Sequence, residues 1–266
     1  MRQTIPFDDV LALARAAGAA IMSVYNDQTQ LDLQHKADAS PLTAADLASH
    51  RIIVDGLARL TPTIPVISEE DTAPQVQNAA AERFWLIDPL DGTKEFIARN
   101  GEFTVNIALI DAGHPVWGVV YAPALGELFW GGPGLGAFRT CPAGTRPIGV
   151  GAWARKQSEA CRVVASKSHL NEETNAFIGR LGAHELIQAG SSLKLCRVAE
   201  GAAHVYPRLG PTCEWDTAAA HAVVEGAGGH VVQLDGTTLR YGKADVLNPY
   251  FVACCVPLGE LVGSDD

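Results

Sequence analysis

The chain has 266 residues, a formal net charge of −10, 47% hydrophobic residues and 19% charged residues. This composition is typical of a folded globular protein of one or two domains and excludes an intrinsically disordered chain. The acidic balance argues against a general nucleic-acid surface. It leaves a small anionic substrate open, because a bound cation can reverse the local field.

The cysteine usage and the start of the chain indicate the compartment. The six cysteines show neither a C-x-x-C pair nor the spacing of a disulfide framework, so we expect reduced, mostly buried thiols in a cytoplasmic protein. The first residues lack the apolar core of a signal peptide, and no apolar run approaches the roughly 20 residues that cross a bilayer. Peripheral association with the cytoplasmic face of the inner membrane is left open, as is the choice between monomer and homodimer.

Two helices and a short strand are predicted before residue 72. Residues 6–25 and 43–60 place apolar side chains at helical spacing, and Thr43 with Asp46 resembles a capping pattern at the start of the second helix. Between these helices, residues 28–43 form a polar segment that we expect to be a hairpin or a loop. Residues 64–71, "IPVISEED", are predicted to be a short apolar strand that ends in acid.

Several strands joined by short turns follow. In residues 103–110 the apolar side chains alternate, which places Phe103, Val105, Ile107 and Leu109 on one face of a strand. Further strands are predicted at 115–123, 126–130 and 136–140. Because the turns between them are short, we expect an antiparallel meander with helices packed on it.

The second half alternates between strand-like and helical segments, which favours an α/β layer. The predicted strands are 161–166, 184–189, 203–207, 230–234 and 250–256, and the predicted helices are 171–181, 192–200 and 216–227. We predict a boundary within 140–160. It divides the chain into an α+β domain (1–145) with the antiparallel sheet and an α/β domain (146–266).

Acidic residues end a strand or begin a helix at four places: Glu69-Glu70, Asp88, Asp91 and Asp216. Hard divalent cations such as Mg²⁺ prefer oxygen ligands, chiefly carboxylates, carbonyls and water. In "WLIDPLDGTKEF" (85–96), Pro89 stiffens the turn, so Asp88 and Asp91 can face one point with the Leu90 carbonyl between them. The pattern predicts a divalent metal site that offsets the repulsion between the carboxylates.

An anion cradle is predicted beside this metal site. Gly92 and Thr93 can begin a short helix whose backbone N–H groups face an anion, and glycine permits a close approach. Simpler interpretations stay open at this point: Asp46, Asp91 and Asp216 can each be only a helix cap, and Glu69-Glu70 can be a solvated loop. Spacing alone does not show that distant segments converge.

These residues match a known family. "DPLDGT" (88–93) followed by "WDTAA" (215–219), with "SEED" (68–71) upstream, resembles the inositol-monophosphatase-like superfamily of Mg²⁺-dependent, lithium-sensitive phosphatases. The sequence is most similar to the CysQ-type branch of bacterial 3′(2′),5′-bisphosphate nucleotidases. The segments that carry this closer resemblance are "SPLTAAD" (40–46), residues 88–110, "GVVYAP" (118–123), "GSSLK" (190–194), "VAEG" (198–201) and "YPRLGPT" (206–212).

The resemblance implies a fold and a set of roles. The fold is a layered α-β-α-β-α sandwich of the sugar-phosphatase type. Two or three Mg²⁺ ions would be held by Glu69, Asp88, the Leu90 carbonyl, Asp91 and Asp216. Thr93 and Asp46 would orient the attacking water, so the catalytic set is Asp46, Glu69 and Thr93. The substrate-binding set is Glu69, Leu90, Asp91, Gly92, Thr93, Ser191, Ser192, Lys194, Arg208 and Asp216.

Part of that substrate-binding set would contact the portion of the substrate beyond the phosphate that is cleaved. Ser191 and Ser192 stand at a predicted helix start, and Lys194 and Arg208 are candidates for the phosphate that is not cleaved. The alternative is that all four are surface polar residues. Residues 165–169, "ASKSH", lie where this branch shapes its nucleotide pocket. Glu214 adds a negative charge beside Asp216, which is expected to tune substrate preference.

The resemblance implies hydrolysis of 3′-phosphoadenosine 5′-phosphate, a small phosphorylated nucleotide, to AMP and phosphate in sulfate assimilation. An inositol phosphate or sugar bisphosphate phosphatase is the first alternative, and a regulatory binding protein on the same fold is the second. Three other features are interpreted structurally: the glycine-rich run 131–136 and the segment 235–237 as turns, and His221 as a packing residue.

Overall fold

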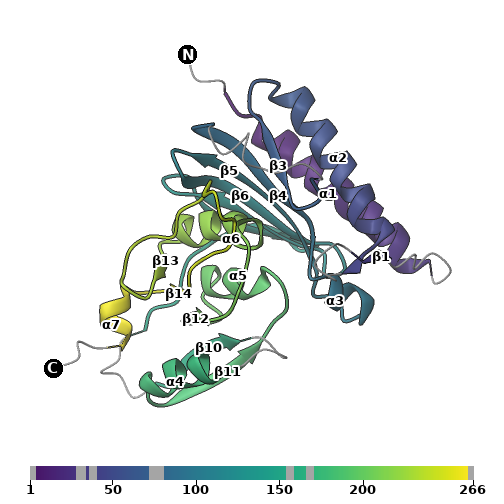
Figure 1. Cartoon of the computed structure of the whole chain (residues 1–266). Coiled ribbons are helices and arrows are strands. Elements are labelled where there is room, and N and C mark those ends of the chain that lie inside the picture. The colour runs from purple at the N-terminus through teal and green to yellow at the C-terminus, as the bar shows by residue number, and fades with distance from the viewer. Residues whose placement is uncertain are drawn as a thin grey trace.

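The computed structural model describes residues 4–27, 34–35, 41–71, 81–153, 159–165 and 171–262. Two large β-sheets, a two-stranded sheet and the surrounding helices make up this part of the chain (Figure 1). The helices are α1 (Phe7–Asn26), α2 (Ala44–Leu60), α3 (Thr93–Ile97), α4 (Glu172–Arg180), α5 (Leu193–Ala199), α6 (Glu214–Gly226) and α7 (Leu258–Val262).

The larger sheet has seven strands in the order β3-β4-β5-β6-β7-β8-β9. Its strands are β3 (Val66–Ser68), β4 (Arg83–Asp91), β5 (Thr104–Asp111), β6 (His114–Ala122), β7 (Glu127–Gly132), β8 (Gly136–Cys141) and β9 (Gly144–Ile148). From β4 to β9 every neighbour is antiparallel, while β3 pairs parallel to β4 at the edge. The predicted meander is therefore confirmed.

Helices α1 and α2 cover one face of this sheet (Figure 1). Residues Val10 and Ile21 of α1 and Ile53 of α2 are buried against strand side chains that include Trp85 and Trp117. The predicted strand face of Phe103, Val105, Ile107 and Leu109 belongs to the same cluster. The alternation along β5 thus predicted correctly which of its residues meet the helices.

The smaller sheet has five strands in the order β11-β10-β12-β14-β13. Its strands are β10 (Cys161–Ala165), β11 (His184–Gln188), β12 (Val205–Arg208), β13 (His230–Gln233) and β14 (Phe251–Cys254). The pairs that involve β10 are parallel, and the pairs that involve β14 are antiparallel. The sheet is therefore mixed, because a helix follows β10 and β11 whereas a loop connects β13 to β14.

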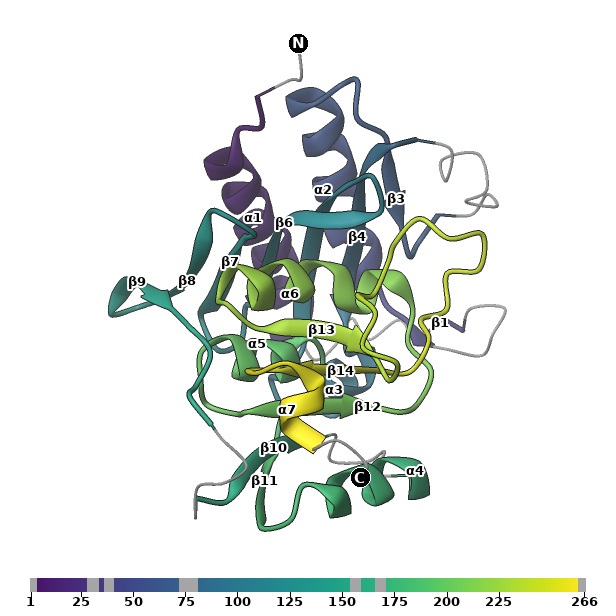
Figure 2. The same cartoon turned by 90° about the vertical axis from the view of Figure 1, so that its left-hand side faces the viewer.

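Helices α5 and α6 lie between the two sheets, and α4 and α7 lie on the far side of the smaller one (Figures 1 and 2). The small residues of α6, such as Ala218, Ala219 and Ala220, are buried and permit close contact with the larger sheet. The sequence of layers is α-β-α-β-α, as expected. No helix in the described part of the chain is both long and apolar enough to span a bilayer.

The structure differs from the sequence expectations in a few elements. β9 and α7 were not predicted, and α6 begins at Glu214 rather than at 216. β9 crosses the predicted boundary between 145 and 146, so the division into two domains stays a prediction. In the polar segment 28–43, Gln34–His35 pairs antiparallel with Pro41–Leu42 (β1 and β2), and its other residues up to 40 lie outside the described part.

Candidate active site

A β-bulge in β4 brings two acidic side chains together. Asp88 pairs with Asn106 and Asp91 pairs with Thr104, so three residue steps on β4 face two steps on β5. In a regular strand, residues three apart point to opposite faces, and one extra residue returns them to the same face. Pro89 lies inside this bulge, where its missing N–H costs no ladder hydrogen bond.

The third carboxylate comes from α6. Asp216 is the third residue of that helix, and its Oδ2 accepts a hydrogen bond of 2.8 Å from the backbone N–H of Cys213. One carboxylate oxygen from each of Asp88, Asp91 and Asp216 lies within 4.8 Å of the other two. The predicted convergence of these three residues is therefore present, and a divalent cation fits their oxygen donor set.

The three carboxylates crowd one another electrostatically. Asp88 is 1% exposed, and this burial, with the neighbouring charges of Glu69, Asp91 and Asp216, raises its pKa well above the usual range. Burial together with the Asp91 charge raises the pKa of Asp216 to about 8. In the absence of a cation, these carboxyl groups therefore lose their protons less readily than usual. A bound cation would favour their ionised forms.

Ser192 connects the carboxylate of Asp91 to the backbone of Asp216. Its backbone N–H donates to Asp91 Oδ2 at 2.6 Å, and its Oγ lies 2.9 Å from that oxygen and 2.6 Å from the Asp216 carbonyl. Asn106 Nδ2 donates to the same Oγ at 2.9 Å. Ser192 is 2% exposed, so its side chain is enclosed among these partners rather than open to a substrate. Its predicted substrate contact stays a prediction.

The predicted catalytic pair lies at the edge of the cluster. Thr93 Oγ1 lies 3.5 Å from Asp46 Oδ1 and 3.5 Å from the Leu90 carbonyl oxygen. Asp46 uses its other oxygen, Oδ2, to accept the Thr43 N–H at 2.8 Å. Asp46 therefore caps α2 and reaches Thr93 at once, so the capping interpretation and the catalytic one do not compete. Glu69 follows β3, close enough for its charge to act on Asp88.

Gly92 occupies a position that no other residue fits. Its φ of +89° is in the left-handed region, and an added Cβ would lie 2.0 Å from Ser191 Oγ. That hydroxyl is itself held 3.0 Å from the Asp91 carbonyl and 2.7 Å from the Glu102 carbonyl. The absence of a Cβ at Gly92 therefore lets the Ser191 side chain pack directly against "DGT".

A cavity of about 140 Å³ opens beside the carboxylates, and a second of about 560 Å³ adjoins it. Both are lined by Lys94, Tyr206 and Arg208, and Lys194 lines the first. Burial lowers the pKa of Lys194, while the charge of Asp91 acts in the opposite direction. Of the predicted site residues, the first cavity is lined by Asp91, Gly92, Ser191, Lys194, Arg208 and Asp216.

Arg208 stands at the end of β12. Its Nη2 donates to the Pro211 carbonyl at 2.7 Å, and its Nε has no hydrogen-bond partner among the described residues. Of the segment 165–169, only Ala165 lies within the described part, and it lines the second cavity.

The carboxylate of Glu214 is bound by residues of the loop between β13 and β14. The side chain is 2% exposed, and its carboxylate accepts hydrogen bonds from the backbone N–H groups of Gly242 and Lys243 and pairs with the Lys243 ammonium. These partners compensate the charge of Glu214 within the fold, and its expected effect on substrate preference stays a prediction. His221 is buried and bonded to Tyr241, in agreement with a packing role, and residues 235–237 form a turn.

Several residues that hold the site were not predicted. Ser49 Oγ donates to the Pro89 carbonyl at 2.7 Å, which attaches α2 to the bulge. Lys94, Thr212 and Thr217 line the first cavity. Lys94 follows the "DGT" motif directly, which was a usable signal, whereas nothing in the local sequence indicates where the Ser49 hydroxyl points.

Comparisons with known proteins agree with this geometry. The model of the inositol monophosphatase family matches residues 6–254. The chain is 49% identical over 245 residues to the 3′(2′),5′-bisphosphate nucleotidase CysQ of Escherichia coli K12, which covers 92% of this chain and 97% of that protein. It is 42% identical over 256 residues to CysQ of Buchnera aphidicola, with 92% of each chain covered.

A solved structure has the same architecture. The crystal structure of CysQ from Bacteroides thetaiotaomicron, described as a bacterial member of the inositol monophosphatase family, matches with a TM-score of 0.82 and 40% identity. The match covers 93% of this chain and 96% of that one. The agreement therefore extends over both sheets and the helices between them.

Proposed function

The chain belongs to the inositol monophosphatase family, and we propose that it hydrolyses 3′-phosphoadenosine 5′-phosphate to AMP and phosphate. The observation that carries this proposal is the cluster of Asp88, Asp91 and Asp216, which opens onto a cavity with basic side chains. The names of the CysQ relatives support the nucleotide substrate. The six free cysteines suit the reducing cytoplasm, where we place the activity.

The acidic cluster fits Mg²⁺, of which we propose two or three ions. Carboxylate and carbonyl oxygens are the ligands this ion prefers, and the raised pKa values of Asp88 and Asp216 reflect their burial and, after it, the neighbouring negative charges. Bound there, Mg²⁺ would lower the pKa of a water molecule and stabilise the oxygen that leaves. The proposed ligands are Glu69, Asp88, the Leu90 carbonyl, Asp91 and Asp216.

Thr93 and Asp46 are proposed to orient the water that attacks. With the Thr93 hydroxyl directed at Asp46 Oδ1, its oxygen can accept a proton of that water. The water oxygen then bonds to phosphorus while the bond from phosphorus to the 3′ oxygen breaks. One proton of the water stays on the released phosphate and the other passes through Thr93 to Asp46. The leaving oxygen takes up a proton from solvent and becomes the ribose hydroxyl of AMP, and no phosphoenzyme forms.

The two cavities suggest how the rest of the nucleotide is held. Gly92 and Thr93 would hold the phosphate that is cleaved. Lys194 and Arg208 would bind the 5′-phosphate, the latter through its guanidinium fork. The second cavity shares Arg208 with the first and offers room for the nucleoside.

The test is a panel of substrates with phosphate release as the readout. We expect the bisphosphorylated nucleotide to be hydrolysed far faster than inositol 1-phosphate or fructose 1,6-bisphosphate, with Mg²⁺ required and Li⁺ inhibitory. Asp91→Asn is the matched inactive control, because it keeps the shape of the side chain. A clear preference for the inositol or sugar phosphate would overturn the proposed substrate and favour the first alternative.

The same substitution separates catalysis from a role in regulatory binding. If the cell needs turnover, Asp91→Ala should reproduce the phenotype of a gene deletion. A cell that carries Asp91→Ala and behaves like wild type would favour the binding role.

A further inference from the structure

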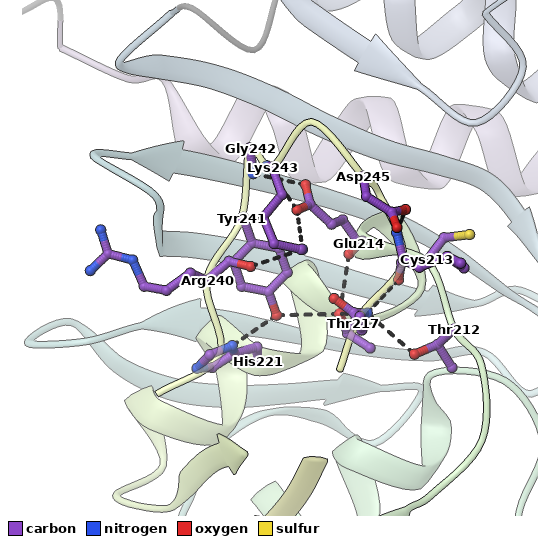
Figure 3. Close-up of polar contacts among 12 residues, drawn as sticks. Thr212, Cys213, Glu214, Thr217, His221, Arg240, Tyr241, Gly242, Lys243 and Asp245 are labelled. Carbon is purple, nitrogen blue, oxygen red and sulfur yellow. Dashed lines mark hydrogen bonds and ion pairs between the residues drawn. The ribbon is translucent and has the colours of Figure 1, made fainter. Parts of the chain in front are cut away.

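The loop between β13 and β14 lies along the first turn of α6 (Figure 3). We call its residues Arg240–Asn248 the α6 strap. Glu214 N donates to the Val246 carbonyl at 2.9 Å, and Asn248 N donates to the Thr212 carbonyl at 2.8 Å. Together with an antiparallel bridge between Cys213 and Leu247, these bonds fix the strap in register with the start of the helix.

The Asn248 side chain adds a second attachment at this end of the strap. Its Nδ2 lies 2.7 Å from the Cys213 carbonyl, 3.1 Å from Thr217 Oγ1 and 3.2 Å from Thr212 Oγ1. Asn248 is 8% exposed, so these contacts are made away from water, where an amide left unpaired would be costly. Thr212 and Thr217 themselves line the first cavity.

The other end of the strap is attached through Glu214. Its carboxylate accepts the backbone N–H groups of Gly242 at 2.8 Å and Lys243 at 3.1 Å and pairs with the Lys243 ammonium. Tyr241, the residue before Gly242, has its hydroxyl 3.3 Å from Thr217 Oγ1 (Figure 3). The strap thus holds the first turn of α6 from both ends through polar contacts that are at least partly buried.

These contacts lead directly to the third acidic residue. Asn248 binds the carbonyl of Cys213, and the N–H of the same Cys213 binds Asp216 Oδ2 at 2.8 Å. We propose that Asn248 is a positioning residue for Asp216, and that the α6 strap sets the affinity of the acidic cluster for divalent cations. This inference rests on the metal site of the proposed function and extends it to residues outside the cluster.

A role in positioning explains why the attachment is polar. Apolar packing would hold a loop on a helix without fixing any single peptide group. Here the amide of Asn248 and the carboxylate of Glu214 each bind backbone groups, which fixes orientation as well as distance. Groups that orient a metal ligand typically change metal affinity or activity by about 10–100-fold when they are removed.

The test measures metal binding separately from turnover. In Asn248→Ala we expect the full-length, metal-free protein to bind Mn²⁺ about tenfold more weakly by titration calorimetry. The KM for Mg²⁺ should rise by a similar factor, while kcat at saturating Mg²⁺ stays within about threefold of wild type.

The matched control is Asp235→Ala, which lies in the same loop. Asp235 Oδ1 binds only Thr237 in a local turn, at 2.9 Å to its N and 2.6 Å to its Oγ1, so its loss should lower the melting temperature without changing Mn²⁺ affinity. Equal Mn²⁺ affinity in Asn248→Ala and wild type would overturn the proposal. So would an equal loss of affinity in Asp235→Ala, because affinity would then follow stability alone.

A second variant decides the matter if Asn248→Ala does not fold. Lys243→Met removes the ammonium from the other end of the strap. We expect its affinity for Mn²⁺ to be about threefold lower than that of wild type. An unchanged affinity for Mn²⁺ would count against the proposal. The calorimetric readout needs no substrate. If the wild-type protein does not hydrolyse the nucleotide, the proposed function is overturned. Weaker Mn²⁺ binding by the variants would still support this inference.

Discussion

Ser192 and Asp91 are 101 positions apart in the chain, yet the N–H of the first donates to the carboxylate of the second at 2.6 Å. Because the Ser192 hydroxyl also contacts the backbone of Asp216, one residue of the loop before α5 fixes both the bulge of β4 and the start of α6. The relative placement of two acidic residues thus depends on a side chain that carries no charge.

Removing that hydroxyl should weaken metal binding. Ser192→Ala removes the nearer acceptor of the buried Asn106 amide, which keeps only Asp91 Oδ2 at 3.4 Å, and leaves the backbone N–H as the only hydrogen bond from residue 192 to Asp91, so we expect the KM for Mg²⁺ to rise about 10–100-fold. The stability loss should be about 1–3 kcal/mol, measured by urea unfolding. Thr61→Val is the control, because it removes a buried hydroxyl that binds Trp85 on the α2 side of the sheet. If both variants change the KM for Mg²⁺ equally, Ser192 has no specific positioning role.

The metal-free protein should lose stability as the pH rises. The folded-state pKa of Asp216 is raised to about 8 from an ordinary value near 4, so between these pH values the folded protein binds more protons than the unfolded one. The free energy of unfolding therefore falls as pH increases through this window. The difference between wild type and Asp216→Asn, measured by urea unfolding in EDTA from pH 5 to 9, should show this slope, and a flat difference would contradict it.

Metal binding should follow the opposite trend. Mg²⁺ needs ionised carboxylates, so its binding releases protons from the cluster and its affinity should increase with pH up to about 8. Titration calorimetry in buffers of different ionisation enthalpy measures the protons released. Binding without proton release would mean that Asp88 and Asp216 are already ionised in the metal-free protein.

Gly92→Ala should abolish turnover for a steric reason. The new Cβ would meet Ser191 Oγ at 2.0 Å, which forces the two backbones apart at the proposed phosphate site. We expect phosphate release to fall at least 100-fold. Gly236→Ala is the matched control, since its φ of +85° is similar but nothing lies within 4 Å of the added atom. That variant should show only the backbone strain of about 1 kcal/mol and normal turnover.

Arg208 should discriminate between substrates with one and two phosphates. Arg208→Gln removes the guanidinium from the cavity, so we expect the KM for the bisphosphorylated nucleotide to rise about 10–100-fold, while that for 3′-AMP changes little. Arg59→Gln, on the exposed side of α2, controls for the change in net charge. Equal effects of Arg208→Gln on the two nucleotides would contradict a role in binding the second phosphate.

Much of the fold was predictable because its elements have regular patterns. The alternation in β5 and the helical spacing of α1 and α2 follow directly from which face each element buries. β9 was missed because Gly144–Ile148 is mostly exposed and carries no apolar alternation, so its only signal is its pairing with β8. α7 was missed because five residues are too few to establish a helical period.

At the site, residue types were predictable and orientations were not. The motif around Asp88 and Asp91 indicated oxygen ligands, but the bulge that turns both to one face depends on pairing with β5. Glu214 shows the limit most clearly: its position next to Asp216 indicated a negative charge close to the site, but not that Lys243 and two backbone N–H groups bind its carboxylate. Such partners come from distant segments that local sequence does not identify.

The order of the segments along the chain also has a consequence for biosynthesis. Asp216 lies 125 positions after Asp91, on the helix that fits between the two sheets. A nascent chain that has left the ribosome only as far as β12 already carries Asp88 and Asp91, but not the third carboxylate. Tight capture of the ion thus has to wait until α6 has been synthesised and has docked, and chains truncated before that helix should remain metal-poor.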